Sequence, residues 1–472
     1  MLFNSFEFLI FFPAVFILYW FFDSKPKAQN IFLLLASYFF YAWWDWRFLS
    51  LIVFSSLVDY LVGLSIYRAN TSKIKKRWLI ISLTANLGLL GVFKYFNFFT
   101  SSFAVLTEKF GWIPNDLTLD LILPVGISFY TFQTLSYTLD IYRGTLKPTT
   151  NAVAFFTYIA FFPQLVAGPI ERASNLLPQV LVKRTFKKEF LKEGILQIAV
   201  GLFRKIVIAD NLANYVDVVY ANLDMHSGIT IIFATFFYAF QIYFDFAGYS
   251  DIAIGTAKLL GFKFQRNFNL PYFACSLTDF WRRWHISLSY WLRDYLYISM
   301  GGNRRGIFIT YRNLMITMLL GGLWHGNSFN FIIWGGIHGL VLSIEKFLNA
   351  NQLFKSLRGT TWVGWILTFA VVLLAWIFFR AENLDMAMLA LRKIFQLKLQ
   401  LPYIGDITMF TNCLAMLIVG ISFDFYLFQS NSRLEVMGSN FNLVELVVLT
   451  CIITVLITLF YSTSDNFIYF QF

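Results

Sequence analysis

Apolar residues run along this chain in long blocks, and short polar stretches separate the blocks. A helix needs about 20 mainly apolar residues to cross the hydrocarbon core of a bilayer. The pattern therefore predicts an all-α polytopic membrane protein with roughly eleven transmembrane helices. The apolar blocks lie at residues 5–22, 31–44, 48–66, 78–97, 119–142, 151–168, 194–213, 229–262, 311–325, 329–348, 361–380, 406–426 and 443–462.

Basic residues gather in the short stretches between these blocks, chiefly at 23–30, 73–77 and 183–192. Short loops rich in Lys and Arg mark the cytoplasmic face of a membrane protein. The formal net charge of +11 is therefore assigned to membrane topology, and no nucleic-acid partner is expected. We expect a multi-pass protein of the cytoplasmic (inner) membrane with the N-terminus outside. Residues 1–22 lack a basic start and a small-residue cleavage site, so they are predicted to be a retained first span.

Composition supports the same class. The chain has 472 residues, of which 58% are hydrophobic and only 13% are charged, whereas soluble domains carry about 25% charged residues. No low-complexity linker or internal repeat is detectable, so residues 1–472 are predicted to form one membrane-embedded domain. Cys275, Cys413 and Cys451 are isolated in apolar surroundings, and their spacing gives neither a disulfide framework nor a metal site.

The basic loops at 73–77 and 183–192 are separated by three apolar blocks, so one block cannot cross fully if both loops face the cytoplasm. Prolines mark the second and third of these blocks, at Pro124, Pro163 and Pro169. We therefore expect re-entrant or broken helices there. Irregular backbone at membrane depth is tolerated where it is buried in protein or lines a wet cavity, which predicts a tunnelled core. The amphipathic stretch 383–398 is predicted to lie at the membrane interface.

Polar residues inside two apolar blocks each allow two interpretations. Lys94 is expected to be a lysine that snorkels from near a helix end, in preference to a functional group. Within 229–262, polar residues recur at near-helical spacing together with small ones. They are suited equally to hydrogen bonding between helices and to lining a site. These residues are Gln241, Asp245, Tyr249, Asp251, Gly248 and Gly255.

The stretch 278–339 holds three of the four histidines, His285, His325 and His338. Ionisable groups at membrane depth are costly to place, so they suggest a functional site by default. Residues 279–295 are predicted to form one helix. An apolar-aromatic face of that helix carries Trp281 and Trp284, and a polar face carries His285 with Arg282, Ser289 and Arg293.

A glycine-rich turn follows at 301–306 and carries Asn303, Arg304 and Arg305. One interpretation is a cytoplasmic turn that follows the charge rule. The other is a docking surface for the phosphates of a soluble donor, which arginine and backbone donors bind well.

His325 ends an apolar helix in Gly-Gly-Leu-Trp-His-Gly, with Asn327 just beyond, and His338 follows 13 positions later. In an unbroken helix the two histidines would face different directions, so they can share a centre only if the chain turns near 326–330. Neither histidine has metal-ligand spacing, and no Gly-x-Ser-x-Gly elbow is present. A histidine acting as general base is the chemistry that remains.

Several of these motifs occur in a recognisable order: YFDFAGYSDIAIG, then FWRRWHISLSYWLRDYLYI, then GGLWHG and WGGIHG. Together they resemble the membrane-bound O-acyltransferase (MBOAT) family. The nearest likeness is to the branch that contains the alginate O-acetyltransferase membrane subunit and its peptidoglycan-acetylating relatives. The resemblance covers about residues 90–345. It implies a many-helix fold that moves an acyl group from a cytoplasmic thioester to an acceptor on the other face.

The resemblance also implies roles for residues. His325 matches the family's near-invariant histidine and His285 matches its second polar position, while His338 matches a histidine of less certain role. The donor would be acetyl-CoA or an acyl carrier protein, no cofactor would be bound permanently, and a relay protein outside the membrane could complete the transfer. The residues expected to line the tunnel or the substrate site are Trp281, Trp284, Arg282, Ser289, Arg293, Asn327, Asp245 and His338.

Three functions follow from these observations. The leading hypothesis is O-acetylation of a cell-surface polysaccharide. D-alanyl transfer toward teichoic acid would use the same fold and similar motifs. A multispan transporter is the alternative from a different class, because transporters also carry charged groups at mid-membrane depth. The lack of an internal repeat and the histidine pairing disfavour the transporter.

Overall fold

The computed structural model describes residues 1–111, 118–119, 121–166, 168–350, 361–396, 400–430, 432–461 and 467–468. Within these residues every regular element is a helix and no strand occurs, which confirms the all-α prediction. The chain divides into two compact units. Unit 1 comprises residues 1–190 and 256–265, and unit 2 comprises 191–255 and 266–472. That residues 1–472 act as one domain stays a prediction.

Seven helical rods in the described residues are long and apolar enough to cross a membrane. Three shorter apolar helices accompany them. The multi-pass membrane class is thereby confirmed, whereas the count of eleven spans is not. The long rods are Pro26–Arg68, Ser72–Glu108, Gly228–Leu259, Ile307–His325, Phe329–Asn349, Trp362–Arg380 and Ile407–Gln429, and the shorter ones are Phe6–Phe21, Ala152–Leu165 and Leu443–Leu459.

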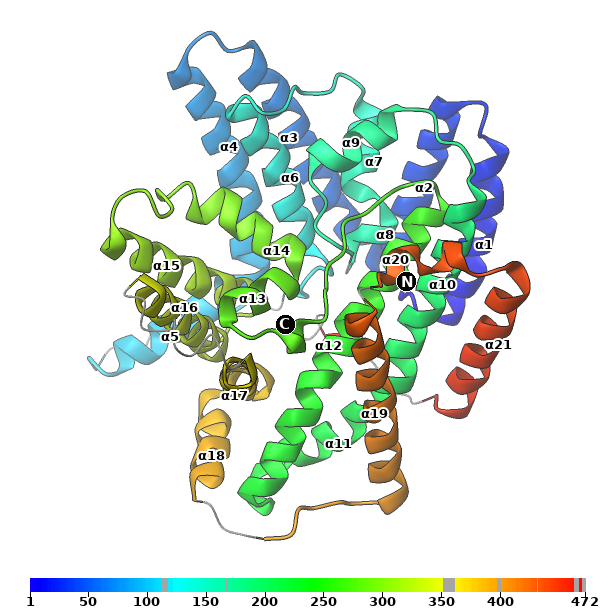
Figure 1. Cartoon of the computed structure of the whole chain (residues 1–472). Helices are drawn as coiled ribbons and strands as arrows, with labels where there is room; N and C mark the ends of the chain where they lie inside the picture. The colour runs from blue at the N-terminus through cyan, green and yellow to red at the C-terminus, as the bar shows by residue number, and fades with distance from the viewer. Residues whose placement is uncertain are drawn as a thin grey trace. The chain divides into compact units, whose positions relative to one another are not determined.

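Unit 1 is built around three long helices, α3, α4 and α6, which lie side by side (Figure 1). Their contact buries polar groups that satisfy one another: Asp59 accepts hydrogen bonds from Ser82 and from Nδ2 of Asn86. The helices of this unit are α1 (Phe6–Phe21), α2 (Pro26–Asp45), η1 (Trp46–Phe48), α3 (Leu49–Arg68), α4 (Ser72–Leu90), η2 (Gly91–Tyr95), α5 (Phe96–Glu108), α6 (Ile127–Tyr142), α7 (Ala152–Ala160), α8 (Phe162–Leu165) and α9 (Ala173–Leu181).

Broken helices occur in unit 1 where the prolines predicted them. The block at 151–168 divides at Phe161 into α7 and α8, and Pro163 lies in the first turn of α8. In the block at 119–142 the helix begins only at Ile127, after Gly126 with φ +75°. That glycine is required, because a Cβ there would lie 2.5 Å from the carbonyl oxygen of Leu165. Whether either block crosses the membrane stays a prediction.

The snorkelling interpretation of Lys94 is wrong. Lys94 lies in the middle of the continuous helical rod 72–108, not near its end. Its side chain is 6% exposed, and its Nζ donates to Oγ of Ser128 at 3.4 Å. A lysine so far from both ends has no short route to the interface, so it is buried inside unit 1.

Unit 2 contains the long helix α12 and the hairpin of α15 and α16 (Figure 1). Helix α11 lies beside α19. The elements of this unit are α10 (Lys188–Leu202), whose first residues belong to unit 1, η3 (Phe203–Ala209), α11 (Asp210–Ala221), η4 (Leu223–Met225), α12 (Gly228–Leu259), whose last residues belong to unit 1, η5 (Pro271–Phe273), α13 (Leu277–Arg283), α14 (Ile286–Trp291), η6 (Leu292–Tyr297), α15 (Ile307–His325), α16 (Phe329–Ala350), α17 (Thr361–Arg380), α18 (Leu384–Phe395), α19 (Ile407–Gln429), α20 (Leu434–Met437), η8 (Gly438–Asn440) and α21 (Leu443–Leu459).

Glycines let the helices of unit 2 approach one another closely. A Cβ at Gly248 of α12 would lie 2.6 Å from the carbonyl oxygen of Gly201 in α10. In the α15–α16 hairpin, a Cβ at Gly322 would lie 2.1 Å from the carbonyl oxygen of Phe331. The chain reverses between the end of α15 at His325 and the start of α16 at Phe329. This is the turn that His325 and His338 need if they are to reach one neighbourhood.

Candidate active site

The helix predicted for 279–295 is broken, and His285 is the break. Helix α13 ends at Arg283, and α14 begins at Ile286. His285 between them has φ +39°, a left-handed conformation that is uncommon for residues other than glycine. The prediction of one continuous helix is therefore wrong, because the chain turns at His285. Backbone strain of this kind collects at functional sites.

Hydrogen bonds to Asn267 stabilise this break. Its carbonyl oxygen accepts the backbone N–H of Ile286 at 2.9 Å. Its Oδ1 accepts from the backbone N–H of Ser287 at 3.4 Å and from the Ser287 hydroxyl at 2.9 Å. The first backbone N–H groups of a helix have no partner within it, and one asparagine satisfies two of them for α14. The same Oδ1 lies 3.1 Å from Nδ1 of His285.

Unit 2 brings the three histidines of the motif stretch into one aromatic cluster. The ring centroids of His285 and His325 lie 6.5 Å apart. The ring of Trp334 contacts both His325 and His338, with its centroid 5.0 Å from that of His325 and 4.7 Å from that of His338. All three histidines are buried, with exposures of 0%, 3% and 1% for His285, His325 and His338.

His338 has a defined partner in this cluster. The indole N–H of Trp281 donates to Nδ1 of His338 at 3.3 Å, and the two rings meet edge to face at 5.3 Å. Trp284 is fully buried between Phe280 and Trp376, at 5.6 and 5.1 Å. Trp281, Trp284, Phe280, Trp334 and Trp376 form the aromatic wall of this cluster. The roles of Trp281 and Trp284 in lining the tunnel or the substrate site stay predictions.

The predicted polar face of 279–295 is not a single face. His285 is buried, whereas Arg282 and Arg293 are exposed. Arg293 forms an ion pair with the neighbouring Asp294 at 2.6 Å. The hydroxyl of Ser289 donates a hydrogen bond to the backbone carbonyl oxygen of Trp284 at 3.1 Å. The break at His285 separates the arginines from the histidine. The roles of Arg282, Ser289 and Arg293 as site-lining residues stay predictions.

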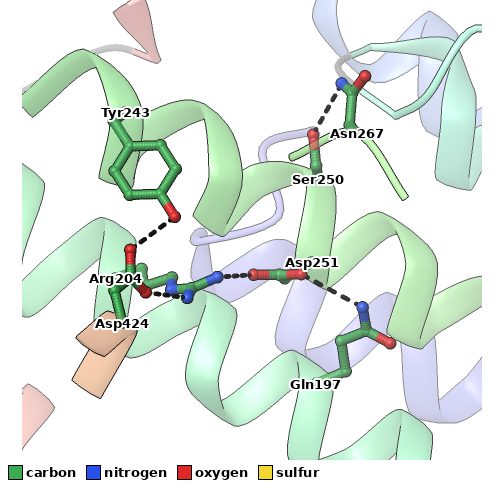
Figure 2. Close-up of polar contacts among 7 residues, drawn as sticks. All are labelled: Gln197, Arg204, Tyr243, Ser250, Asp251, Asn267 and Asp424. Atoms are coloured by element: carbon green, nitrogen blue, oxygen red, sulfur yellow. Dashed lines mark hydrogen bonds and ion pairs between the residues drawn. The ribbon is translucent and has the colours of Figure 1, made fainter. Parts of the chain in front are cut away.

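The polar stripe of α12 takes part in ion pairs between helices (Figure 2). Arg204 of η3 bridges Asp251 at 2.7 Å and Asp424 of α19 at 2.8 Å. Tyr243 donates its hydroxyl to the second oxygen of Asp424 at 2.7 Å. These partners support the interpretation of the stripe as a link between helices. Arg204, Tyr243 and Asp251 also line a cavity of about 40 Å³ together with Ser250 and Asn267, so a site-lining role for the stripe is compatible with the ion pairs.

Asp245 forms a second pair of the same kind. It lies 2.8 Å from Nζ of Lys205, and Lys205 also binds Asp210 at 2.7 Å. The other carboxylate oxygen of Asp245 accepts the backbone N–H of Ile468 at 2.7 Å. Contact with a substrate by Asp245 stays a prediction, because the described residues already supply partners for this carboxylate.

The chain's last described residues pack against the wall of the cluster. Phe467 stacks on Tyr249 at 4.2 Å and contacts Phe246 at 5.8 Å. Phe246 in turn meets the imidazole of His285 edge to face at 4.8 Å. A residue more than 200 positions along the chain from α12 therefore completes the packing behind His285.

The predicted donor-docking turn is a surface feature. Asn303, Arg304 and Arg305 are exposed. Positive φ angles at Gly301, Gly302 and Gly306 shape the turn. Asn313 of α15 holds it by donating to the carbonyl oxygen of Gly302 at 3.0 Å. Asn327 is exposed in the middle of the turn between α15 and α16. The described residues contain no cluster of His, Cys, Asp or Glu that could hold a metal ion.

Comparison with known proteins identifies the family. The sequence profile of the membrane-bound O-acyltransferase (MBOAT) family matches residues 146–387. The chain is 46% identical to the probable alginate O-acetylase AlgI of Pseudomonas aeruginosa over 389 residues, which cover 82% of this chain and 73% of that protein. The chain belongs to the MBOAT family. It is accordingly a multi-pass membrane O-acyltransferase.

Two further relatives show the range of MBOAT chemistry around this chain. The peptidoglycan O-acetyltransferase of Helicobacter pylori is 38% identical over 423 residues, 83% of this chain and 79% of the relative. The teichoic acid D-alanyltransferase of Bacillus subtilis is 28% identical over 273 residues, 55% of this chain and 69% of the relative. The resemblance drawn from the motifs, to the MBOAT family and to its alginate and peptidoglycan O-acetyltransferase branch, is thereby confirmed.

Proposed function

We propose that this MBOAT enzyme transfers an acetyl group from a cytoplasmic thioester to hydroxyls of a cell-surface polysaccharide, directly or through a relay protein outside the membrane. The observation that carries the proposal is the approach of His285 and His325, with ring centroids 6.5 Å apart, inside a buried aromatic wall. The names of the more similar relatives, an alginate O-acetylase and a peptidoglycan O-acetyltransferase, support acetyl as the group and a polysaccharide as the acceptor.

The reaction needs one proton acceptor and one electrophilic carbon. His325 removes the proton from the acceptor hydroxyl as its oxygen attacks the thioester carbonyl carbon. The carbon–sulfur bond then breaks, and the thiolate leaves and takes up a proton, so that an ester and a free thiol result. A positioned general base contributes about 10²–10⁴-fold to such a step. The aromatic wall excludes water, which would otherwise compete with the acceptor hydroxyl.

The donor is acetyl-CoA or an acetylated carrier protein, and no cofactor is bound permanently. His285 lies on the route of the donor, near the thioester. The exposed turn carrying Asn303, Arg304 and Arg305 offers guanidinium groups to the donor's phosphates. The Lys- and Arg-rich loops at 73–77 and 183–192 are of the kind found on the cytoplasmic face, which supports the cytoplasmic membrane as the proposed location of the enzyme.

Turnover by the purified protein in lipid vesicles tests the proposal. Acetyl-CoA labelled in the acetyl group, and separately an acetylated carrier protein, would be added outside vesicles in which the basic loops face outward. Acidic and neutral oligosaccharides would be supplied on the other face. Thioester loss that depends on both the protein and an acceptor is the expected result, together with acetyl ester on the oligosaccharide.

Two outcomes would redirect the proposal. Turnover of a D-alanyl thioester with no turnover of acetyl donors would assign the D-alanyl chemistry instead. Passage of intact donor or oligosaccharide across the vesicle membrane without thioester cleavage would indicate a transporter. A protein with His325 replaced by Ala serves as the matched control in every arm.

A further inference from the structure

Asn267 lies outside every motif that identifies the family resemblance, yet it contacts His285 directly. Its Oδ1 lies 3.1 Å from Nδ1 of His285. Both residues are buried, Asn267 at 1% and His285 at 0% exposure. Asn267 belongs to the segment that follows α12, and its side chain lies beside His285 at the break between α13 and α14.

The orientation of the Asn267 amide is fixed by its neighbours. The backbone N–H of Ser287 points at the same atom that faces His285, at 3.4 Å. A backbone N–H can only donate, so this atom must be the carbonyl oxygen of the amide. The NH₂ group on the other side donates to Oγ of Ser250 at 3.2 Å (Figure 2), which agrees with this assignment.

The amide oxygen then dictates the state of the imidazole. An amide oxygen can only accept a hydrogen bond, so the Nδ1 that faces it must carry a proton. In a neutral imidazole one nitrogen donates and the other accepts. Nε2 of His285 is therefore the nitrogen with the free electron pair.

We propose that Asn267 is a positioning residue that holds His285 in the Nδ1–H tautomer, so that Nε2 accepts a proton or a hydrogen bond during acyl transfer. The inference rests on the proposed role of His285 in the reaction. His338 provides the contrast within the same cluster. Its Nδ1 accepts from the indole N–H of Trp281 at 3.3 Å, and an indole can only donate. Neutral His338 is therefore the Nε2–H tautomer, opposite to His285.

The groups around His285 determine how a substitution at position 267 would affect it. Its ring contacts are Phe246 from α12 and Trp324 and His325 from α15. His325 is a titratable group in ring contact with His285, and the charged residues Arg204, Asp251 and Arg266 line the cavity that Asn267 also lines. A charge placed at position 267 would act on His285, whose Nδ1 lies 3.1 Å from the Asn267 side chain, as well as on the charged groups of that cavity.

The first test compares two substitutions at position 267. Asn267→Leu removes the acceptor, and we expect kcat to fall on the order of 10- to 100-fold with little change in KM, as for other groups that orient histidines. Asn267→Asp keeps an acceptor but adds a charge that stabilises the imidazolium. We expect this variant to regain activity at high pH, with the acid limb of its kcat profile shifted upward. Asn269→Leu, two positions along and not bonded to His285, is the matched control.

A spectroscopic test needs no turnover. In protein labelled with ¹⁵N-histidine, the nitrogen shifts distinguish the two neutral tautomers, and the chain has only four histidines to resolve. We expect a signal of the Nδ1–H tautomer that disappears in His285→Gln and changes in Asn267→Leu, while His338 remains Nε2–H in both.

The outcomes separate this inference from the proposed function. If wild type transfers acyl groups but Asn267→Leu keeps the wild-type kcat and pH profile, Asn267 has no positioning role. An Nε2–H signal for His285 in wild type would overturn the tautomer assignment whatever the activity. If wild type cleaves no thioester while the Nδ1–H signal is present, the proposed function fails and the assignment stands.

Discussion

The imidazole rings of His285 and His325 lie with their centroids 6.5 Å apart, although the two residues come from different elements of unit 2. His325 ends a long helix, whereas His285 occupies a left-handed break between two short ones. Two predictions concern this pair, and three concern a buried ion pair, close helix packing and a buried carboxyl group elsewhere in the chain.

Replacement of His325 should remove the general base. We expect His325→Ala to fold and to insert normally but to lose acyl transfer by about 10²–10⁴-fold. Initial rates of thioester loss with acceptor present measure the change. His226→Ala is the matched control, because His226 lies in the loop before α12 with its ring 4.8 Å from Tyr403. Near-normal transfer by a well-folded His325→Ala protein would place the chemistry elsewhere.

His285 and His338 should differ in their contributions. His285→Ala is expected to impair both transfer and donor hydrolysis, because His285 contacts His325 directly. His338→Ala should be the milder change, since the described contacts of His338 are with the aromatic wall. Parallel assays of transfer and hydrolysis in the two variants provide the comparison. A larger loss in His338→Ala would reverse the assignment of the pair.

Removal of Arg204 should destabilise unit 2. Arg204→Met leaves the buried carboxylates of Asp251 and Asp424 without their cation (Figure 2). Breaking a buried pair from one side costs about 3–5 kcal/mol, so a clear fall in Tm is expected. Arg47→Met is the control, because the pair of Arg47 with Asp45 is exposed and contributes little. Equal Tm values for the two variants would show that the buried network is not stabilising.

A methyl group at Gly248 should separate α10 from α12. Gly248→Ala places Cβ 2.6 Å from the carbonyl oxygen of Gly201, and overpacking of this kind costs about 1–3 kcal/mol. Gly88→Ala in α4 has no heavy atom within 4 Å of its Cβ. That change should be neutral or should stabilise the helix by up to about 1 kcal/mol. Thermal unfolding of the two alanine variants should therefore move in opposite directions or by clearly different amounts.

Glu171 should make the stability of unit 1 depend on pH. Burial raises the pKa of Glu171 from 4.5 to about 7, although the backbone N–H of Gln265 and the amide of Asn175 hydrogen-bond its carboxylate. A carboxyl group with a raised pKa contributes stability that is complete below pH 4.5 and is lost as pH rises through 7. The loss amounts to about 3 kcal/mol for such a shift.

Glu171→Gln keeps an oxygen acceptor and cannot ionise. We expect the slope of Tm against pH between the two pKa values to flatten in this variant relative to wild type. Asp406 at the N-terminus of α19 has a lowered pKa, so its contribution to stability depends on pH in the opposite direction. Asp406→Asn should therefore leave the fall in Tm toward neutral pH in place. An unchanged slope in Glu171→Gln would show that another group titrates.

Local patterns predicted much of this fold. Apolar blocks located the long helices, and prolines located the break between α7 and α8. His325 ends a helix before a glycine, as its motif suggested. Glycines such as Gly248 permit the close helix packing that small residues indicate. The helix positions, the proline break and the helix end at His325 depend on residues near one another in sequence, and that is why the sequence alone was sufficient for them.

The features that were missed depend on distant residues. The helix pattern across 279–295 is regular, but Asn267 binds two backbone N–H groups of α14 and stabilises the turn at His285. Likewise, hydropathy could not reveal that Lys94 would find Ser128 as a buried partner. An asparagine outside any motif gives no signal of its own. Only the arrangement of the folded chain shows which backbone groups it satisfies.

The packing of Phe467 on Tyr249 and Phe246 affects how the protein should be handled in the laboratory. Phe246 contacts the ring of His285. An affinity tag or a fluorescent protein fused near residue 467 would therefore disturb packing next to the histidine cluster. Reduced activity in such a fusion would reflect the label and not the enzyme. Labels attached elsewhere, with an untagged preparation for comparison, would keep the kinetic assays interpretable.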